Sequence, residues 1–300
     1  MKKKMRCLFT SASLLLICGM LSGCGKEDSG SQAVSVSQQE AASQKEYENV
    51  ITVGDTTQAE AWTQTEIYSP EIQDTFVVDV CLPQEYDDTK KYPVVYLTDC
   101  NWRREDYKTF TELYESGKIR EFILVGIGYP DSYDFDTIRV RDLLENPDAF
   151  LGMIVNGVMP YVESTYAIDQ SDRTFCGASY GGYFTVYSMF QNDGITRGLF
   201  RNYILASPTF FESTNGLPLA DYEDSYNRKY GDEKFDANIY MSVGGDEDQA
   251  DFIRPIEKFV KRLEKREYQG MNLIYKEYEG MGHYDVWVPT LIDGLSEFMK

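Results

Sequence analysis

Short apolar runs alternate with helical patterns along most of this chain. Residues 92–97 and 122–127 are continuously apolar, as is typical of strands buried on both faces of a sheet. Further strands are predicted over 202–206, 239–243 and 271–278. Strands that alternate with helices in this way predict the α/β class, with a mostly parallel central sheet and helices on both faces.

The N-terminal part of this pattern is different. Apolar and polar residues alternate over 75–82, which is typical of a strand with one face in the core. A further strand is predicted over 65–68, and Pro83 with the polar residues 84–91 connects the strand over 75–82 to the strand over 92–97. We expect this N-terminal part to form an antiparallel edge of the sheet.

Helical spacing of apolar residues predicts five helices, over 105–116, 146–162, 180–190, 253–263 and 286–298. Two long segments have no clear period. Residues 131–144 combine acids, arginines and turn residues, so we expect a loop over the edge of the sheet, with Arg139 and Arg141 near the substrate. Residues 209–236 are polar and aromatic and follow a strand end, which predicts a lid.

The first 46 residues do not belong to this pattern. Basic residues precede an apolar run over 7–21, which is shorter than the roughly 20 residues that span a bilayer, so residues 1–23 are predicted to be a signal peptide. Residues 24–46 are rich in Ser, Gln, Ala and Gly and are predicted to be a flexible tether. One globular domain is expected over 47–300.

The end of the apolar run indicates lipid attachment. Leu21-Ser22-Gly23-Cys24 resembles the lipobox of bacterial lipoproteins, which implies that Cys24 is lipidated and becomes the first mature residue. The protein is therefore expected outside the cytoplasm, anchored through lipid to a bacterial cell membrane. The alternative is an ordinary secretory signal that happens to end near a cysteine.

Charge and cysteine content exclude several classes of function. The net charge of −20 argues against a nucleic-acid-binding protein, because a basic surface that could follow phosphates is missing. Beyond Cys24, the remaining cysteines are Cys81, Cys100 and Cys176, an odd number without close spacing. They suggest neither a disulfide framework nor a zinc site, and we expect them to be buried.

One stretch indicates nucleophilic chemistry. Gly177-Ala178-Ser179-Tyr180-Gly181 has the pattern G-x-S-x-G between a predicted strand and a predicted helix. A serine in such a tight turn stands clear of the strand end, and small neighbours are needed where strand and helix nearly touch. A glycine-rich turn of this kind can also bind phosphate, and that alternative stays open on this motif alone.

The residues that a serine nucleophile needs occur further along the chain. The only histidine, His283, follows Ser179 and is the single candidate for an imidazole base. A third member would be a carboxylate that orients the imidazole. Asp246, Glu247 and Asp248 lie between serine and histidine, which is the α/β-hydrolase order. From the residues alone these acids could instead cap a helix, or less readily bind calcium.

Several stretches together carry a family resemblance: Tyr92 to Asp99, Met159-Pro160-Tyr161-Val162-Glu163, the elbow with Gly182, Ser207-Pro208 and Gly282-His283. On these residues the chain resembles, over about 64–300, the putative esterase family of α/β-hydrolases. That family includes enterobactin esterases, feruloyl and acetylxylan esterases, S-formylglutathione hydrolases and mycolyltransferases. The resemblance implies an α/β-hydrolase fold and no metal or organic cofactor.

The resemblance also selects one acid, because the family pattern G-x-x-[DE] falls on Gly244 and Glu247. A triad of Ser179, Glu247 and His283 is therefore expected to form an acyl-enzyme with an ester. The oxyanion hole is expected at the backbone N–H groups of Tyr180 and of Asn101 or its neighbour. In the family, the loop that corresponds to the one around Asn101 usually reads Leu-Asp-Gly or His-Gly, and this chain lacks that glycine.

The expected substrate is an extracellular ester with a bulky or aromatic part. An aromatic cleft with arginines that read a polar group is expected to include Trp102, Arg139, Arg141, Tyr183 and Tyr284. Acyl or hydroxycinnamoyl esters of carbohydrate are placed first, and an enterobactin-type trilactone second. An acyltransferase, and a surface binding protein that keeps the fold without activity, remain as alternatives.

Overall fold

The computed structural model describes residues 50–59, 61–191, 193–214 and 217–300. The predicted signal peptide, tether and lipidation site at Cys24 lie outside these residues. Within them, no helix combines the length and the apolar character that crossing a bilayer requires.

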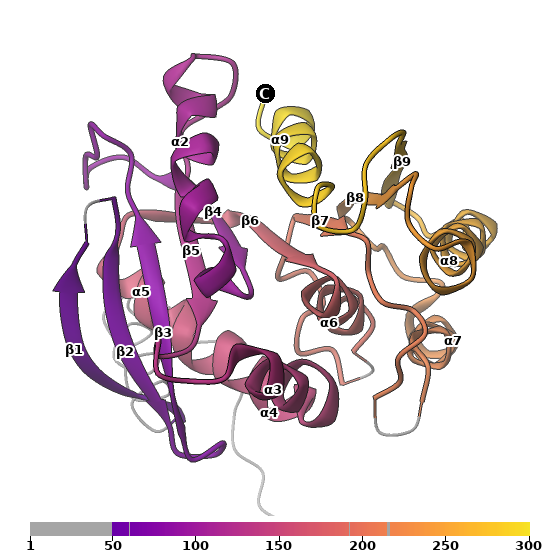
Figure 1. The fold of residues 1–300 in the computed structure, drawn as a ribbon, viewed down its shortest axis with the longest axis horizontal. Coiled ribbons are helices and arrows are strands. Elements are labelled where there is room, and N and C mark those ends of the chain that lie inside the picture. The colour runs from indigo at the N-terminus through magenta and orange to yellow at the C-terminus, as the bar shows by residue number, and fades with distance from the viewer. Residues whose placement is uncertain (1–49, 60, 192, 215–216) are drawn as a thin grey trace, which may run out of the picture.

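One nine-stranded sheet runs through the described part of the chain in the order β1-β2-β3-β5-β4-β6-β7-β8-β9 (Figure 1). The strands are β1 (Thr52–Gln58), β2 (Thr63–Ser69), β3 (Asp74–Cys81), β4 (Tyr92–Leu97), β5 (Ile123–Gly128), β6 (Ile168–Ala178), β7 (Asn202–Ala206), β8 (Asn238–Gly244) and β9 (Asn272–Tyr278). Pairing is antiparallel from β1 to β5 and parallel from β5 to β9. This confirms the predicted sheet with its antiparallel N-terminal edge.

Helices cover both faces of the sheet (Figure 1). They are α2 (Tyr107–Glu115), α3 (Phe135–Val140), α4 (Pro147–Met153), α5 (Met159–Thr165), α6 (Tyr180–Met189), α7 (Leu219–Tyr230), α8 (Arg254–Arg266) and α9 (Trp287–Phe298). The larger core lies between the sheet and α4, α5, α6 and α8, and the smaller one lies under α2 and α9. All six residues of β4 and of β5 are buried, because helices pack on each side of them.

Strand β1 was not predicted, and its sequence explains why. All seven residues of Thr52–Gln58 are exposed, and most of them are polar. A strand that buries neither face shows no alternation, so hydrophobic periodicity does not reveal it.

The loop predicted over 131–144 is largely helical. Helix α3 is followed by a π-helical turn over Arg141–Glu145. The segment looked like a surface loop because it is polar, yet Arg139 is only 6% exposed and Asp142 is fully buried. Both side chains are buried in ion pairs, Arg139 with Asp99 and Asp142 with the partly exposed Arg141, so their polarity did not indicate exposure.

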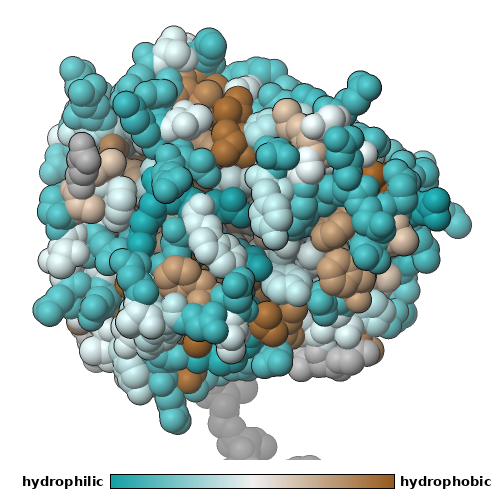
Figure 2. Space-filling view, in the orientation of Figure 1, coloured by the Kyte–Doolittle hydropathy of each residue, from teal (hydrophilic) through white to brown (hydrophobic). Residues whose placement is uncertain are grey.

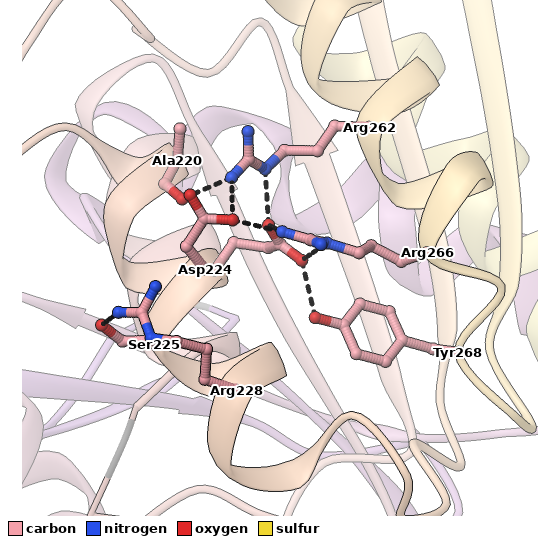
Figure 3. Close-up of polar contacts among 8 residues, drawn as sticks. Ala220, Asp224, Ser225, Arg228, Arg262, Arg266 and Tyr268 are labelled. Carbon is pink, nitrogen blue, oxygen red and sulfur yellow. Dashed lines mark hydrogen bonds and ion pairs between the residues drawn. The ribbon is translucent and has the colours of Figure 1, made fainter.

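The segment over 209–236, for which a lid is predicted, contains the docked helix α7. Glu223 of α7 is fully buried and accepts hydrogen bonds from Arg262 (2.5 Å), Arg266 (2.8 Å) and Tyr268 (2.6 Å). Figure 3 shows these three side chains reaching from α8 and the residues after it toward α7. This network fastens α7 to α8.

The face shown in Figure 2 is mostly hydrophilic, with separate hydrophobic patches between the polar side chains. Cys81, Cys100 and Cys176 are all buried and free, as predicted.

Candidate active site

Ser179 lies in the tight turn between β6 and α6. Its backbone has φ 58° and ψ −119°, a region that side-chain-bearing residues rarely adopt. A hydrogen bond holds this turn against the neighbouring strand, because Ser179 N–H donates to the Ala206 carbonyl of β7 (2.9 Å). A β-carbon on Gly177 would lie 2.2 Å from the Gly181 carbonyl oxygen, so the approach of strand and helix requires glycine there. The sequence pattern G-x-S-x-G is thus explained by strain and close packing.

The N-terminus of α6 begins directly after this serine. Its first N–H groups, starting with Tyr180, have no partner within the helix, and no acidic residue occupies its first turn. These groups and the positive end of the helix dipole favour negative charge beside Ser179. The arrangement is therefore suited to an oxyanion.

His283 contacts one of the three candidate acids. The distance from its Nδ1 to Glu247 Oε2 is 2.7 Å, and the Glu247 side chain is nearly fully buried. Asp246 and Asp248 are exposed, and Asp248 accepts from the backbone N–H groups of Ala250 and Asp251. Among the interpretations that the sequence left open for these acids, Asp248 thus fits helix capping, whereas Glu247 lies against the imidazole.

Parallel strands bring these residues to one edge of the sheet. Ser179, Glu247 and His283 follow the carboxyl ends of β6, β8 and β9, which all run in the same direction. In the described residues Ser179 Oγ makes no hydrogen bond with His283, as is common before a substrate binds. When Nδ1–H donates to Glu247, Nε2 of the neutral imidazole is unprotonated and can accept a proton from another group.

Aromatic side chains surround the imidazole. The Phe252 ring lies 4.5 Å from that of His283 and the Tyr284 ring 5.6 Å from it. Phe211, which is half exposed, packs edge-on against Phe252. Residues at the start of the predicted lid therefore do border the site, and Tyr284, at 94% exposure, is free to contact a ligand.

At the first residue of α6, Arg139 lies between two aromatic rings. Its guanidinium is 4.8 Å from the Trp102 ring and 4.9 Å from the Tyr180 ring. Trp102 is 42% exposed, whereas Arg139 is buried and forms a two-bond ion pair with Asp99. The pair keeps the pKa of Arg139 above its ordinary value although burial lowers it. Trp102 is thus available to a substrate, and Arg139 is already occupied.

Contacts with the substrate or the oxyanion were predicted for three further residues, Tyr183, Arg141 and Asn101. Tyr183 is fully buried in the larger core, so it has no surface for a substrate, and the prediction was wrong. Arg141 pairs with Asp74 and Asp142. Two residues apart on a helical segment point to different sides, so Arg141 does not share the position of Arg139.

Asn101 is the third of these residues. Its side chain accepts from Tyr129 N–H (2.9 Å) and donates to the Tyr129 carbonyl (2.8 Å). These bonds tie the loop after β4 to the end of β5 and leave the backbone of Cys100–Trp102 in a short 3₁₀ turn. The amide side chain therefore supports the loop in which the second oxyanion donor was predicted.

Sequence reasoning missed two contacts of the site. The Ser207 hydroxyl donates to Glu247 Oε1, and the Asp99 carboxylate accepts from Arg139. Both Ser207 and Asp99 follow strand ends and have positive φ, of 44° and 59°. Both residues follow predicted strands and belong to stretches that carry the family resemblance, but neither signal revealed their partners.

Comparison with known proteins finds similarity of this chain to esterases. A family model described as putative esterase matches residues 69–298. The ferri-bacillibactin esterase BesA of Bacillus subtilis (strain 168) is 25% identical over 254 residues, which cover 75% of this chain and 84% of BesA.

Solved structures share the fold. The BES protein from Bacillus cereus superposes with a TM-score of 0.67 at 22% identity, over 83% of this chain and 99% of its own. The enterobactin and salmochelin hydrolase IroE has a TM-score of 0.61 at 18% identity, over 80% and 96%. A ferulic acid esterase from Anaeromyces mucronatus has a TM-score of 0.58 at 18% identity, over 82% and 97%.

Proposed function

This chain belongs to the putative esterase family and is a carboxylic ester hydrolase, and we propose that it works through an acyl-enzyme on Ser179. In this proposal His283 is the general base and Glu247 orients its imidazole. The observation that carries the proposal is the 2.7 Å contact between His283 Nδ1 and Glu247 Oε2, at the same edge of the sheet as a serine in a strained elbow.

The reaction follows from these positions. Ser179 Oγ attacks the ester carbonyl carbon while its proton passes to His283 Nε2, and the carbonyl oxygen becomes an oxyanion. The N–H of Tyr180 and one N–H of the loop after β4 stabilise that charge, each worth about 3 kcal/mol. The tetrahedral intermediate expels the alcohol, which takes the proton from His283. Water, deprotonated by the same imidazole, then releases the acid.

For the substrate, we reverse the order that the sequence alone suggested. The similarity to BesA, described as a ferri-bacillibactin esterase, supports a lactone or ester of a catecholate siderophore ahead of carbohydrate esters. The exposed rings of Trp102, Phe211 and Tyr284 offer stacking surfaces for an aryl group. Hydroxycinnamoyl esters of carbohydrate come second, because the same rings fit them.

The decisive experiment measures Ser179-dependent hydrolysis. Purified wild-type protein and Ser179→Ala are compared on p-nitrophenyl esters, an enterobactin-type trilactone, methyl ferulate and acetylated xylan. We expect hydrolysis by the wild type, and loss of nearly all of it in Ser179→Ala with unchanged thermal stability. Equal turnover by both proteins would refute the mechanism.

The same assay separates the alternatives. Cleavage of methyl ferulate or acetylated xylan without cleavage of the trilactone would again place carbohydrate esters first among the substrate classes. Product esters that form only when alcohol or sugar acceptors are added would indicate an acyltransferase. Binding of an ester without turnover would indicate a binding protein that keeps the fold.

A further inference from the structure

Asp99 carries a negative charge close to the N-terminus of α6. A β-carbon on Gly181, the second residue of that helix, would lie 2.9 Å from Asp99 Oδ2 and 2.3 Å from Thr98 Oγ1. The carboxylate therefore lies against the first turn of α6, whose N–H groups are proposed to bind the oxyanion. Asp99 is also buried, with 6% exposure, so water does little to screen it.

This charge opposes the proposed reaction unless it is balanced. The transition state of ester hydrolysis places a second negative charge on the carbonyl oxygen, and two like charges at short range destabilise each other. Arg139 supplies the balance, since its Nε and one terminal nitrogen contact the two carboxylate oxygens at 2.9 and 2.6 Å. Only a planar fork such as guanidinium makes both bonds at once.

The same arginine also touches both sides of the predicted hole. Its guanidinium lies between the ring of Trp102, in the loop after β4, and the ring of Tyr180, the first residue of α6. Asp99 itself begins that loop in the left-handed conformation, with φ 59°, which residues with a side chain rarely adopt. The ion pair thus fixes a backbone turn that is otherwise unfavourable.

We propose that Arg139 is a positioning residue for ester hydrolysis, which neutralises Asp99 and fixes the loop after β4 so that the oxyanion hole is formed. The inference rests on the proposed acyl-enzyme mechanism. The sequence suggests that Arg139 contacts a polar group of the substrate. The inference assigns Arg139 to the Asp99 carboxylate instead.

The test is a double-mutant cycle with Arg139→Gln, Asp99→Asn and both together. For Arg139→Gln we expect kcat on a neutral p-nitrophenyl ester to fall about 10- to 100-fold with little change in KM. Arg103 is also within electrostatic reach of Asp99 and limits the loss. Asp99→Asn should lose less, and the double variant should recover most of the kcat that Arg139→Gln lost.

A second measurement isolates charge from shape. An alkylboronic acid binds as an anionic adduct when Ser179 Oγ bonds to boron and His283 takes the hydroxyl proton. Its affinity should fall in Arg139→Gln and return in the double variant, in parallel with kcat. Arg139→Lys keeps the charge without the fork and should fall between wild type and Arg139→Gln.

A matched control is the Arg173–Glu163 pair, which has the same two-bond geometry at 2.7 and 2.7 Å on another part of the sheet. Arg173→Gln should lower stability and leave kcat of the folded protein unchanged. Additive losses in the Asp99 and Arg139 cycle, or a loss confined to KM, would overturn the inference while Ser179-dependent hydrolysis stands. Absence of that hydrolysis in the wild type would instead refute the proposed function.

Discussion

Ser207 donates its hydroxyl hydrogen to the carboxylate oxygen of Glu247 that faces away from His283. Gly244 N–H donates to the same oxygen at 2.8 Å. Both carboxylate oxygens therefore have fixed partners, and the rotation of the carboxylate is restricted. A carboxylate that is oriented in this way can hold an imidazole in one tautomer.

We predict that Ser207→Ala lowers kcat on a p-nitrophenyl ester about 10-fold with KM nearly unchanged. The reason is that Glu247 Oε1, the oxygen not bonded to His283, loses one of its two hydrogen bonds. Steady-state kinetics at one pH give both constants.

Ser188→Ala is the matched control for this substitution. Ser188 lies on α6 and is also fully buried. Its hydroxyl donates to the Thr185 carbonyl, away from the site. The two variants should lose similar stability, on the order of 1 kcal/mol, and only Ser207→Ala should lose activity. Equal kcat values for the two variants would mean that Ser207 has a structural role only.

Much of the fold could be predicted because its signals are local. Strands β4 and β5 are continuous apolar runs, and the elbow reads directly as G-x-S-x-G. The contacts that complete the site could not be predicted in the same way. The Arg139–Asp99 and Ser207–Glu247 partners are each 40 residues apart in the chain, and no periodic pattern links them.

The acid assignment makes a separate prediction. Glu247→Gln should lower kcat at least about 100-fold, because the amide no longer stabilises the charged imidazole. Asp246→Asn and Asp248→Asn are the controls, since both side chains are exposed and neither contacts His283. All three variants are compared by kcat/KM on one ester. A larger loss in either control than in Glu247→Gln would show that the wrong carboxylate has been assigned.

Cys24 yields a prediction about location, motivated by Leu21-Ser22-Gly23-Cys24 and the polar stretch after it. We predict that the wild-type protein is lipidated and fractionates with membranes, and that Cys24→Ser appears in soluble fractions. Metabolic labelling with a fatty acid and mass spectrometry of the N-terminal peptide measure the modification. An unmodified wild-type protein with a different N-terminus would contradict it.

The docking of α7 on α8 can be tested through Glu223. Its carboxylate is fully buried between Arg262, Arg266 and Tyr268 (Figure 3), so Glu223→Gln removes the buried one of the two carboxylates that pair with both guanidinium groups and leaves them only Asp224. Both arginines are about one quarter exposed, which reduces the cost of the loss. We expect the free energy of unfolding to fall by about 2 kcal/mol.

Asp224 provides the matched control on the same helix. Burial tends to raise its pKa, but the hydrogen bonds and charges of Arg262 and Arg266 outweigh this and leave the pKa lowered. A carboxyl group with a lowered pKa in the folded state stabilises the protein above its ordinary value of 3.8, and this contribution is lost as the pH falls through the lowered value. Asp224→Asn should therefore destabilise the protein by less than about 1 kcal/mol at pH 7, and the difference from wild type should vanish in acid.

Activity then distinguishes a docked helix from a lid. If α7 is a fixed part of the domain, kcat and KM of Glu223→Gln should equal those of the wild type at temperatures where the variant is folded. A lid would behave differently, because loosening it changes substrate access or product release and alters kcat and KM together. Kinetics measured well below the unfolding transition of each protein make the comparison. Altered kcat and KM in a fully folded Glu223→Gln would restore the lid interpretation for the whole segment over 209–236.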